Sequence, residues 1–174
     1  YIDTAWPYHG GESEPLVGRA LCGGYRDKVM LAPKSPVFSI QKPEEFEEIL
    51  EAQLKKLQTD HIDFYLMHSL SKNTWENVVL KFGLLDKAVR AKKEGKIRHI
   101  GFSFHDEFPV FQQIADGFDQ WEFCQIQLNY ADTQNQAGLR GLEYAAACGL
   151  DVVIMEPLRG GPVSYTHLTL PTIR

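Results

Sequence analysis

Short runs rich in β-branched and aromatic residues alternate along the chain with longer segments whose apolar residues recur at helical spacing. The short runs predict strands at residues 1–4, 28–32, 62–67, 97–102, 123–128 and 151–156. The longer segments predict helices at residues 13–22, 43–58, 74–94, 108–116 and 136–148. The strand starts recur about every 30 residues, which is the length of one βα unit.

The segment 43–58 has the clearest helical pattern. Its glutamates come first and its lysines last, which complements the helix dipole, and Pro43 suits the first helical position. One face carries a stripe that consists of Phe46, Ile49, Leu50, Gln53, Leu54 and Leu57. We expect this face to be buried against the sheet.

Regular alternation of strands and helices predicts an α/β fold with a parallel sheet, because βα crossovers are right-handed. Two architectures satisfy the pattern, an open doubly wound sheet and an eight-stranded barrel. No strand is followed by a Gly-x-Gly-x-x-Gly turn, which argues against a Rossmann dinucleotide site.

Composition and charge narrow the class of partner. The 174 residues include 18 Lys+Arg against 23 Asp+Glu, a formal net charge of -5, without a run of basic residues. Nucleic acid and anionic membrane surfaces are therefore not expected partners, and a small molecule is. The longest apolar stretches are far shorter than the roughly 20 residues needed to cross a bilayer. The three cysteines lack a C-x-x-C pair, which is typical of a cytoplasmic protein with buried thiols and no metal site.

The last residues break the pattern. Where the alternation calls for a helix, residues 162–174 have no helical stripe, and they resemble a translated cloning or sequencing-adapter sequence. We therefore take residues 1–161 as one unit and expect the tail to be non-native. The chain also begins inside a predicted strand, so both ends look cut.

Ionisable residues stand where successive strands end. Asp3 closes the first strand, Tyr8 follows it, Lys34 comes after the second strand and His68 ends the third. The carboxyl ends of parallel strands meet on one face, where ligands bind in α/β folds, so we expect these four side chains to converge. Taken singly, each also suits a structural role, as a cap, a loop aromatic, a surface lysine or a core histidine.

Together the four groups predict a proton-transfer set. An ammonium beside a phenol lowers the phenol pKa, so we expect Lys34 to lower the pKa of Tyr8. Asp3 would keep the buried Lys34 protonated and oriented. His68 could donate a further hydrogen bond, so that the set would protonate and polarise a carbonyl while hydride arrives from elsewhere.

Five segments carry sequence motifs that are typical of one known family. They are Tyr1-Ile2-Asp3-Thr4-Ala5 with Tyr8, Gly10-Gly11 and Glu12; Asp63-Phe64-Tyr65-Leu66-Met67-His68; Gly95-Lys96-Ile97-Arg98-His99-Ile100-Gly101-Phe102-Ser103; Gln125-Ile126-Gln127-Leu128-Asn129-Tyr130; and Met155-Glu156-Pro157-Leu158-Arg159-Gly160-Gly161. In this order they resemble the aldo-keto reductase family over residues 1–161. The resemblance implies a (β/α)8 TIM barrel, here incomplete because the first and last strands are missing.

The resemblance also implies an activity: reduction of an aldehyde or ketone by hydride from NADP(H) or NAD(H). It makes Tyr8 the general acid, lets Lys34 and Asp3 tune it, and has His68 orient the carbonyl. It assigns cofactor binding to Ser103, Gln125, Met155, Leu158 and Gly160. Ser103 and Gln125 match positions that bind the nicotinamide carboxamide, and Leu158 and Gly160 match backbone contacts to the pyrophosphate. Phe104 departs from the family pattern, because many relatives have Asn there.

The wording after the fourth and sixth predicted strands is similar to a bacterial branch of the family that often carries a ferredoxin-like iron–sulfur segment after the barrel. The cysteines of this chain lack the spacing for a cluster, so such a module would belong to sequence that is not present. Two other functions stay open: a non-catalytic nicotinamide-binding regulatory barrel and a metal hydrolase. We further expect the 174 residues alone to be poorly soluble and inactive, because unpaired strand edges promote association.

Overall fold

The structure is a computed structural model and describes residues 1–158. Its strands are β1 (Ile2–Asp3), β2 (Leu31–Ala32), β3 (Lys34–Ser35), β4 (Ile62–Leu70), β5 (Ile97–Phe104), β6 (Phe123–Gln127) and β7 (Asp151–Met155). Its α-helices are α1 (Ser13–Ala20), α2 (Glu45–Leu57), α3 (Lys72–Thr74), α4 (Leu84–Lys93), α5 (Phe108–Asp116) and α6 (Gly138–Ala147). Three 3-10 turns cover Tyr8–Gly11, Arg26–Lys28 and Val37–Ser39.

All strand pairs are parallel, and the strands form two sheets. β1 pairs with β2, and a larger sheet has the order β3-β4-β5-β6-β7. Pro33 separates the two sheets along the chain, because β2 ends before it and β3 begins after it. The backbone of β2 therefore pairs towards β1, whereas that of β3 pairs towards β4.

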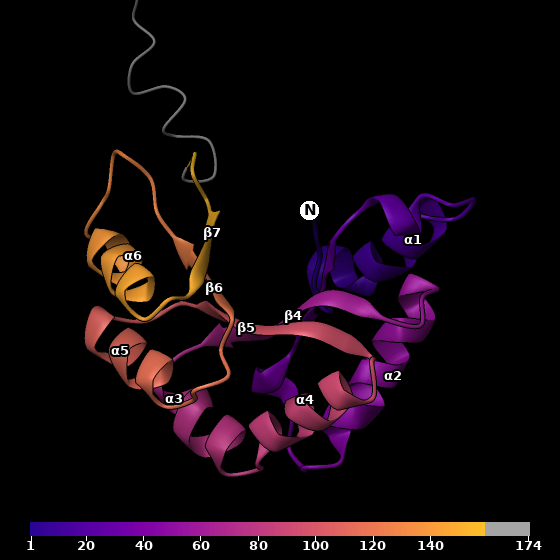
Figure 1. The fold of residues 1–174 in the computed structure, drawn as a ribbon, viewed down its shortest axis with the longest axis horizontal. Coiled ribbons are helices and arrows are strands. Elements are labelled where there is room, and N and C mark those ends of the chain that lie inside the picture. The colour runs from indigo at the N-terminus through magenta and orange to yellow at the C-terminus, as the bar shows by residue number, and fades with distance from the viewer. Residues whose placement is uncertain (159–174) are drawn as a thin grey trace, which may run out of the picture.

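The larger sheet is curved, and helices α2, α4, α5 and α6 lie along its outer side (Figure 1). The main apolar core fills the space between the outer face of the sheet and these helices, and includes Phe46, Tyr65, Trp75 and Phe102. A smaller cluster on the inner face joins Ala32, Leu66 and Phe123. Sheet order and helix placement confirm the predicted parallel α/β fold as an arc of the TIM-barrel type, and the arc does not close within residues 1–158.

Two predicted elements differ from the structure. The strand expected at 28–32 is shorter, because Arg26–Lys28 form a 3-10 turn and pairing starts only at Leu31. The helix expected at 74–94 is interrupted: Trp75–Leu80 form a π-helix, and α4 begins after Gly83, whose φ of 61° is left-handed. A left-handed residue cannot continue a right-handed helix, so one apolar pattern corresponds here to separate segments.

Helix α2 matches its prediction well. It runs over Glu45–Leu57, and its buried residues are Phe46, Leu50, Gln53, Leu54 and Leu57.

Within residues 1–158, none of the helices combines the length and the apolar character that crossing a bilayer requires.

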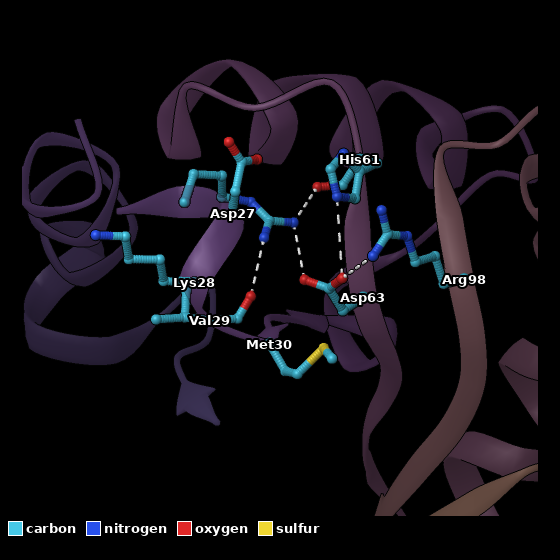
Figure 2. Close-up of a pocket in the computed structure, with 8 residues that line it drawn as sticks. Asp27, Lys28, Val29, Met30, His61, Asp63 and Arg98 are labelled. Carbon is cyan, nitrogen blue, oxygen red and sulfur yellow. Dashed lines mark hydrogen bonds and ion pairs between the residues drawn. The ribbon is translucent and has the colours of Figure 1, made fainter. Parts of the chain in front are cut away.

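The amino ends of β4 and β5 hold an ion-pair centre around Asp63, which is 1% exposed (Figure 2). Asp63 accepts from Arg26 and Arg98, at 2.8 Å each, and from the Leu31 backbone N–H at 2.9 Å. Arg26 donates in addition to Thr59 Oγ1 and to the Val29 and His61 carbonyls. The cavity of about 300 Å³ beside this centre is thus bordered by groups that already bind one another, and we assign the centre a structural role.

Candidate active site

The structure brings the four predicted proton-transfer residues together at the carboxyl ends of the strands. Asp3 is the last residue of β1, Lys34 is the first of β3, and His68 lies near the end of β4. Tyr8 begins the 3-10 turn that follows β1. The side-chain tips therefore open towards one region, as the parallel topology predicts.

Lys34 and Asp3 form the central ion pair. The Lys34 Nζ donates to Asp3 Oδ1 over 2.5 Å and to the Thr4 carbonyl over 3.0 Å. Lys34 is 1% exposed, so burial lowers its pKa, while the charge and hydrogen bond of Asp3 act in the opposite direction. The pair meets the expectation that Asp3 orients Lys34.

Tyr8 stands beside this pair. The Lys34 Nζ is 5.0 Å from the centroid of the Tyr8 ring, and the His68 ring is 5.9 Å away in an edge-on arrangement. The Tyr8 side chain is accessible, with 38% of the residue exposed. The phenol thus lies between an ammonium, an imidazole and the open side of the site.

The expected direction of the Tyr8 pKa is wrong. Burial raises the pKa of Tyr8, and the negative charges of Asp3 and Glu156 raise it further. Burial and the two nearby carboxylates all disfavour the charged phenolate. Tyr8 is therefore held in its protonated form at neutral pH, which is the form a proton donor needs.

His68 is neutral at physiological pH. Burial and, to a smaller extent, the positive charge of Lys34 lower its pKa from 6.5 to about 4. The strand is irregular beside it, because the pairing register shifts between Met67 and Leu70 and Ser69 has a φ of 56°. The Nδ1 of His68 is buried and has no hydrogen-bond partner within residues 1–158. A neutral imidazole can still donate one N–H to an oxygen.

Three predicted cofactor residues lie on neighbouring strands. Ser103 of β5 is in register with Gln125 of β6, and Met155 ends the adjacent strand β7. Because strand residues alternate between faces, Met155 shares its face with Val153, which packs on the inner cluster. The carboxyl ends of β5, β6 and β7 thus continue the site from the proton-transfer residues.

Gln125 connects the two groups of residues. Its Nε2 donates to Asp3 Oδ2 over 3.0 Å, whereas its buried Oε1 has no partner within residues 1–158. The Ser103 hydroxyl oxygen accepts from the Ser69 backbone N–H over 2.7 Å. The unpaired Oε1 of Gln125 needs a donor, and an amide N–H of a ligand would supply one.

Phe104, the position that departs from the family pattern, is fully buried and packs on Phe111, with the ring centroids 5.2 Å apart, so its side chain belongs to the core. Two predicted cofactor positions remain. Leu158 follows β7 and is 55% exposed. Gly160 and the tail 162–174 lie outside the described residues.

Two residues of the site were not singled out from the sequence. Phe38 is 50% exposed, and its ring centroid lies 5.6 Å from that of His68, so it borders the site. Gln53 of α2 is fully buried and donates to the Lys34 carbonyl. The only sequence signal for Gln53 is a polar residue within an otherwise apolar stripe.

A metal centre has no support in the described part of the chain, where no three His, Cys, Asp or Glu residues gather in a geometry that could hold a metal ion. His61, which precedes β4, and Asp63 lie 3.9 Å apart and belong to the ion-pair centre instead. The chemistry of the site is thus that of an acid, a phenol, an amine and an imidazole.

The fold and the site define a parallel α/β barrel protein whose polar groups converge at the strand ends. The model of the Aldo/keto reductase family matches residues 1–172. The chain belongs to the Aldo/keto reductase family.

Individual relatives agree. The chain is 30% identical to the uncharacterized oxidoreductase YrpG of Bacillus subtilis, over 92% of this chain and 54% of that protein. It is 28% identical to an NADH-specific methylglyoxal reductase of Escherichia coli, over 95% of this chain and 54% of that protein. A solved aldo-keto reductase from Klebsiella pneumoniae, in complex with NADPH, aligns with a TM-score of 0.73 at 28% identity, over 91% of this chain and 52% of the other. The chain thus spans about half the length of these relatives.

Proposed function

We propose that this chain carries the proton-transfer site of a reductase that converts a small aldehyde or ketone to an alcohol with NADPH. The observation that carries the proposal is the ion pair at 2.5 Å between the buried Lys34 and the more exposed Asp3, with Lys34 beside Tyr8 and Tyr8 beside His68. A buried ammonium is costly unless it is paired, and its position next to a phenol suits a reaction that leaves a phenolate.

In this reaction Tyr8 is the general acid. Its hydroxyl donates a proton to the carbonyl oxygen while hydride adds to the carbonyl carbon, so the carbonyl becomes an alcohol and Tyr8 becomes a phenolate. The raised pKa of Tyr8 keeps the proton in place until the oxygen gains negative charge. Lys34 lies 5.0 Å from the ring and stabilises the phenolate. Solvent then returns the proton through the exposed side of Tyr8.

His68 orients the carbonyl. Its pKa of about 4 leaves it neutral, so it donates a hydrogen bond to the carbonyl oxygen without taking the proton that Tyr8 supplies. Phe38, whose ring centroid lies 5.6 Å from that of His68, borders the space for the substrate. A small carbonyl compound fits this arrangement, and methylglyoxal is a suitable probe because two relatives are named methylglyoxal reductases.

A nicotinamide cofactor supplies the hydride when bound. The residues present fit such a group, because the buried Gln125 Oε1 requires a donor and a carboxamide N–H would provide it. Ser103 and Met155 would border the same ring from β5 and β7. We put NADPH before NADH because the Klebsiella pneumoniae structure contains NADPH, and the comparison of the two cofactors in kcat/KM decides between them.

The test is Tyr8→Phe in a complete homologous chain, with Tyr25→Phe as the matched control because Tyr25 is an exposed tyrosine outside the site. Reduction of methylglyoxal is followed by the loss of NADPH absorbance, and NADPH binding by fluorescence. Tyr8→Phe should lower kcat by about 10³-fold and leave NADPH affinity unchanged, whereas Tyr25→Phe should change neither. Undiminished reduction by Tyr8→Phe would refute the proposal, and NADPH binding without turnover of any carbonyl would favour the non-catalytic barrel.

A further inference from the structure

The backbone beside the proposed lysine is held in an unusual way. The Ala32 carbonyl accepts from the Thr4 N–H of the β1 side, and the Pro33 carbonyl accepts from the Leu66 N–H of the β4 side. Since carbonyls alternate in direction along a strand, the Lys34 carbonyl points again to the β1 side. The chain of β1 has turned away by then, because it continues into the turn that bears Tyr8.

A side chain of α2 takes the place of the absent backbone partner. Gln53 donates through Nε2 to the Lys34 carbonyl over 3.1 Å and to Glu14 Oε1 over 2.5 Å. Its Oε1 accepts from the Tyr65 hydroxyl over 2.7 Å. Gln53, Glu14 and Tyr65 are all fully buried, so each of these bonds lies in a site that excludes water.

The same network reaches the segment that carries Tyr8. The Lys56 Nζ lies 3.4 Å from Glu14 Oε2 and 3.4 Å from the centroid of the Trp6 ring. Trp6 is two residues before Tyr8, and Thr4 is bonded to Ser13 by their hydroxyl groups over 2.8 Å. The backbone of Lys34 is therefore connected to the buried Gln53–Glu14 pair, and the segment of Tyr8 is connected to the same pair through the partly exposed Lys56.

We propose that Gln53 is a positioning residue, which substitutes for the missing β1 partner of the Lys34 carbonyl and so fixes the backbone from which the Lys34 ammonium reaches Asp3. This role rests on the proposed function for its effect on turnover. Its effect on Lys34 itself does not depend on any reaction, so the two can be tested separately.

The experiment compares Gln53→Met with Tyr65→Phe in the full chain. Methionine has a similar length and removes all three bonds of Gln53, whereas Tyr65→Phe removes only the bond that Gln53 accepts and leaves both donated bonds. With methylglyoxal and NADPH, Gln53→Met should lower kcat at least about tenfold and move the basic limb of its pH profile, with the KM for NADPH changed less than about twofold. Tyr65→Phe should lower the melting temperature and change kcat less than about twofold.

A second measurement needs no turnover. In protein with isotope-labelled lysine, the side-chain NMR signal of Lys34 is assigned by its absence in Lys34→Arg. We expect the titration midpoint of this signal to shift in Gln53→Met and to stay unchanged in Tyr65→Phe. This expectation holds even if the wild-type protein reduces no carbonyl. An unchanged Lys34 signal in Gln53→Met, or equal changes in both variants, would overturn the positioning role. Should Gln53→Met not fold, Gln53→Asn replaces it, because the shorter amide withdraws from the Lys34 carbonyl.

Discussion

Gln125 donates a hydrogen bond to Asp3 over 3.0 Å and so joins two residues that stand 122 positions apart in the chain. Asp3 thus receives Lys34 on one carboxylate oxygen and Gln125 on the other. A residue assigned to cofactor binding is thereby in direct contact with a residue assigned to proton transfer. Cofactor affinity and proton transfer should therefore respond together to changes at Gln125.

Replacing Gln125 by methionine tests this connection. The change removes the donor to Asp3 and the unpaired Oε1, so we expect NADPH to bind about tenfold more weakly, which is about 1.4 kcal/mol and equals one hydrogen bond. The turnover rate should fall as well, because Asp3 loses one partner. Titration of NADPH fluorescence and steady-state kinetics measure the two effects. Gln113→Met, on the surface of α5, should change neither, and a Gln125→Met protein with normal NADPH affinity would remove Gln125 from the cofactor site.

Asp3→Asn should make turnover more sensitive to alkaline pH. The negative charge of Asp3 raises the pKa of both Lys34 and Tyr8, so its loss lowers the pKa of each group and they deprotonate at lower pH. The basic limb of the kcat profile should move to lower pH, with kcat at pH 7 reduced by about 10²-fold. Asp106→Asn is a suitable control, because within residues 1–158 Asp106 accepts only from the backbone N–H groups of Lys72, at the exposed start of α3, and of Glu107. A basic limb that does not move in Asp3→Asn would contradict this electrostatic role.

His68 should make the fold sensitive to acid. Its pKa is lowered from 6.5 to about 4 in the folded protein, so the folded state binds the proton less well than the unfolded state. The neutral imidazole contributes to stability in full above pH 6.5, and that contribution, about 3 kcal/mol, is lost as the pH falls towards 4.

Urea denaturation between pH 7 and pH 4 measures this loss. His68→Gln should lose less stability than the wild type over this range. Burial also lowers the pKa of His105, which therefore adds a smaller loss in the same direction, and His105→Gln separates the two. Identical pH dependence in the wild type and in His68→Gln would show that the imidazole is not buried as the structure has it.

The ion-pair centre at the amino ends of the strands should matter for stability alone. Asp63→Asn leaves Arg26 beside a neutral group in a buried place, and we expect a loss of about 3 kcal/mol in the free energy of unfolding. Arg98→Met removes a partner whose side chain is 55% exposed, so its cost should stay below about 1 kcal/mol. Urea denaturation at pH 7 compares the two variants. A larger loss in Arg98→Met than in Asp63→Asn would contradict this assignment.

The sequence predicted the parts of the site that follow from topology. Polar residues at the ends of parallel strands must converge, and Asp3, Lys34 and His68 do so. The pattern could not show what depends on burial: the pKa of Tyr8 moves upward because burial and the negative charges of Asp3 and Glu156 raise it. Nor could it show contacts between distant segments, such as that of Gln125 with Asp3.

A local signal in the sequence accounts for one difference between the predicted and the observed elements. Gly83 was visible in the sequence, and it interrupts a helix that the apolar pattern alone made continuous. Gln53 is the opposite case, since its position in the stripe predicted its burial correctly while its partners lay beyond any local pattern.

The change of pairing partner at Pro33 divides the proposed proton-transfer residues between the two-stranded and the five-stranded sheet. Asp3 and Tyr8 belong to the two-stranded sheet and the turn after β1, whereas Lys34 and His68 belong to the five-stranded sheet. A local separation of the two sheets would break the Lys34–Asp3 ion pair while leaving the five-stranded sheet intact. The site would then lose its arrangement before the whole protein unfolds, and the side-chain hydrogen bonds between the two sheets determine how often this happens.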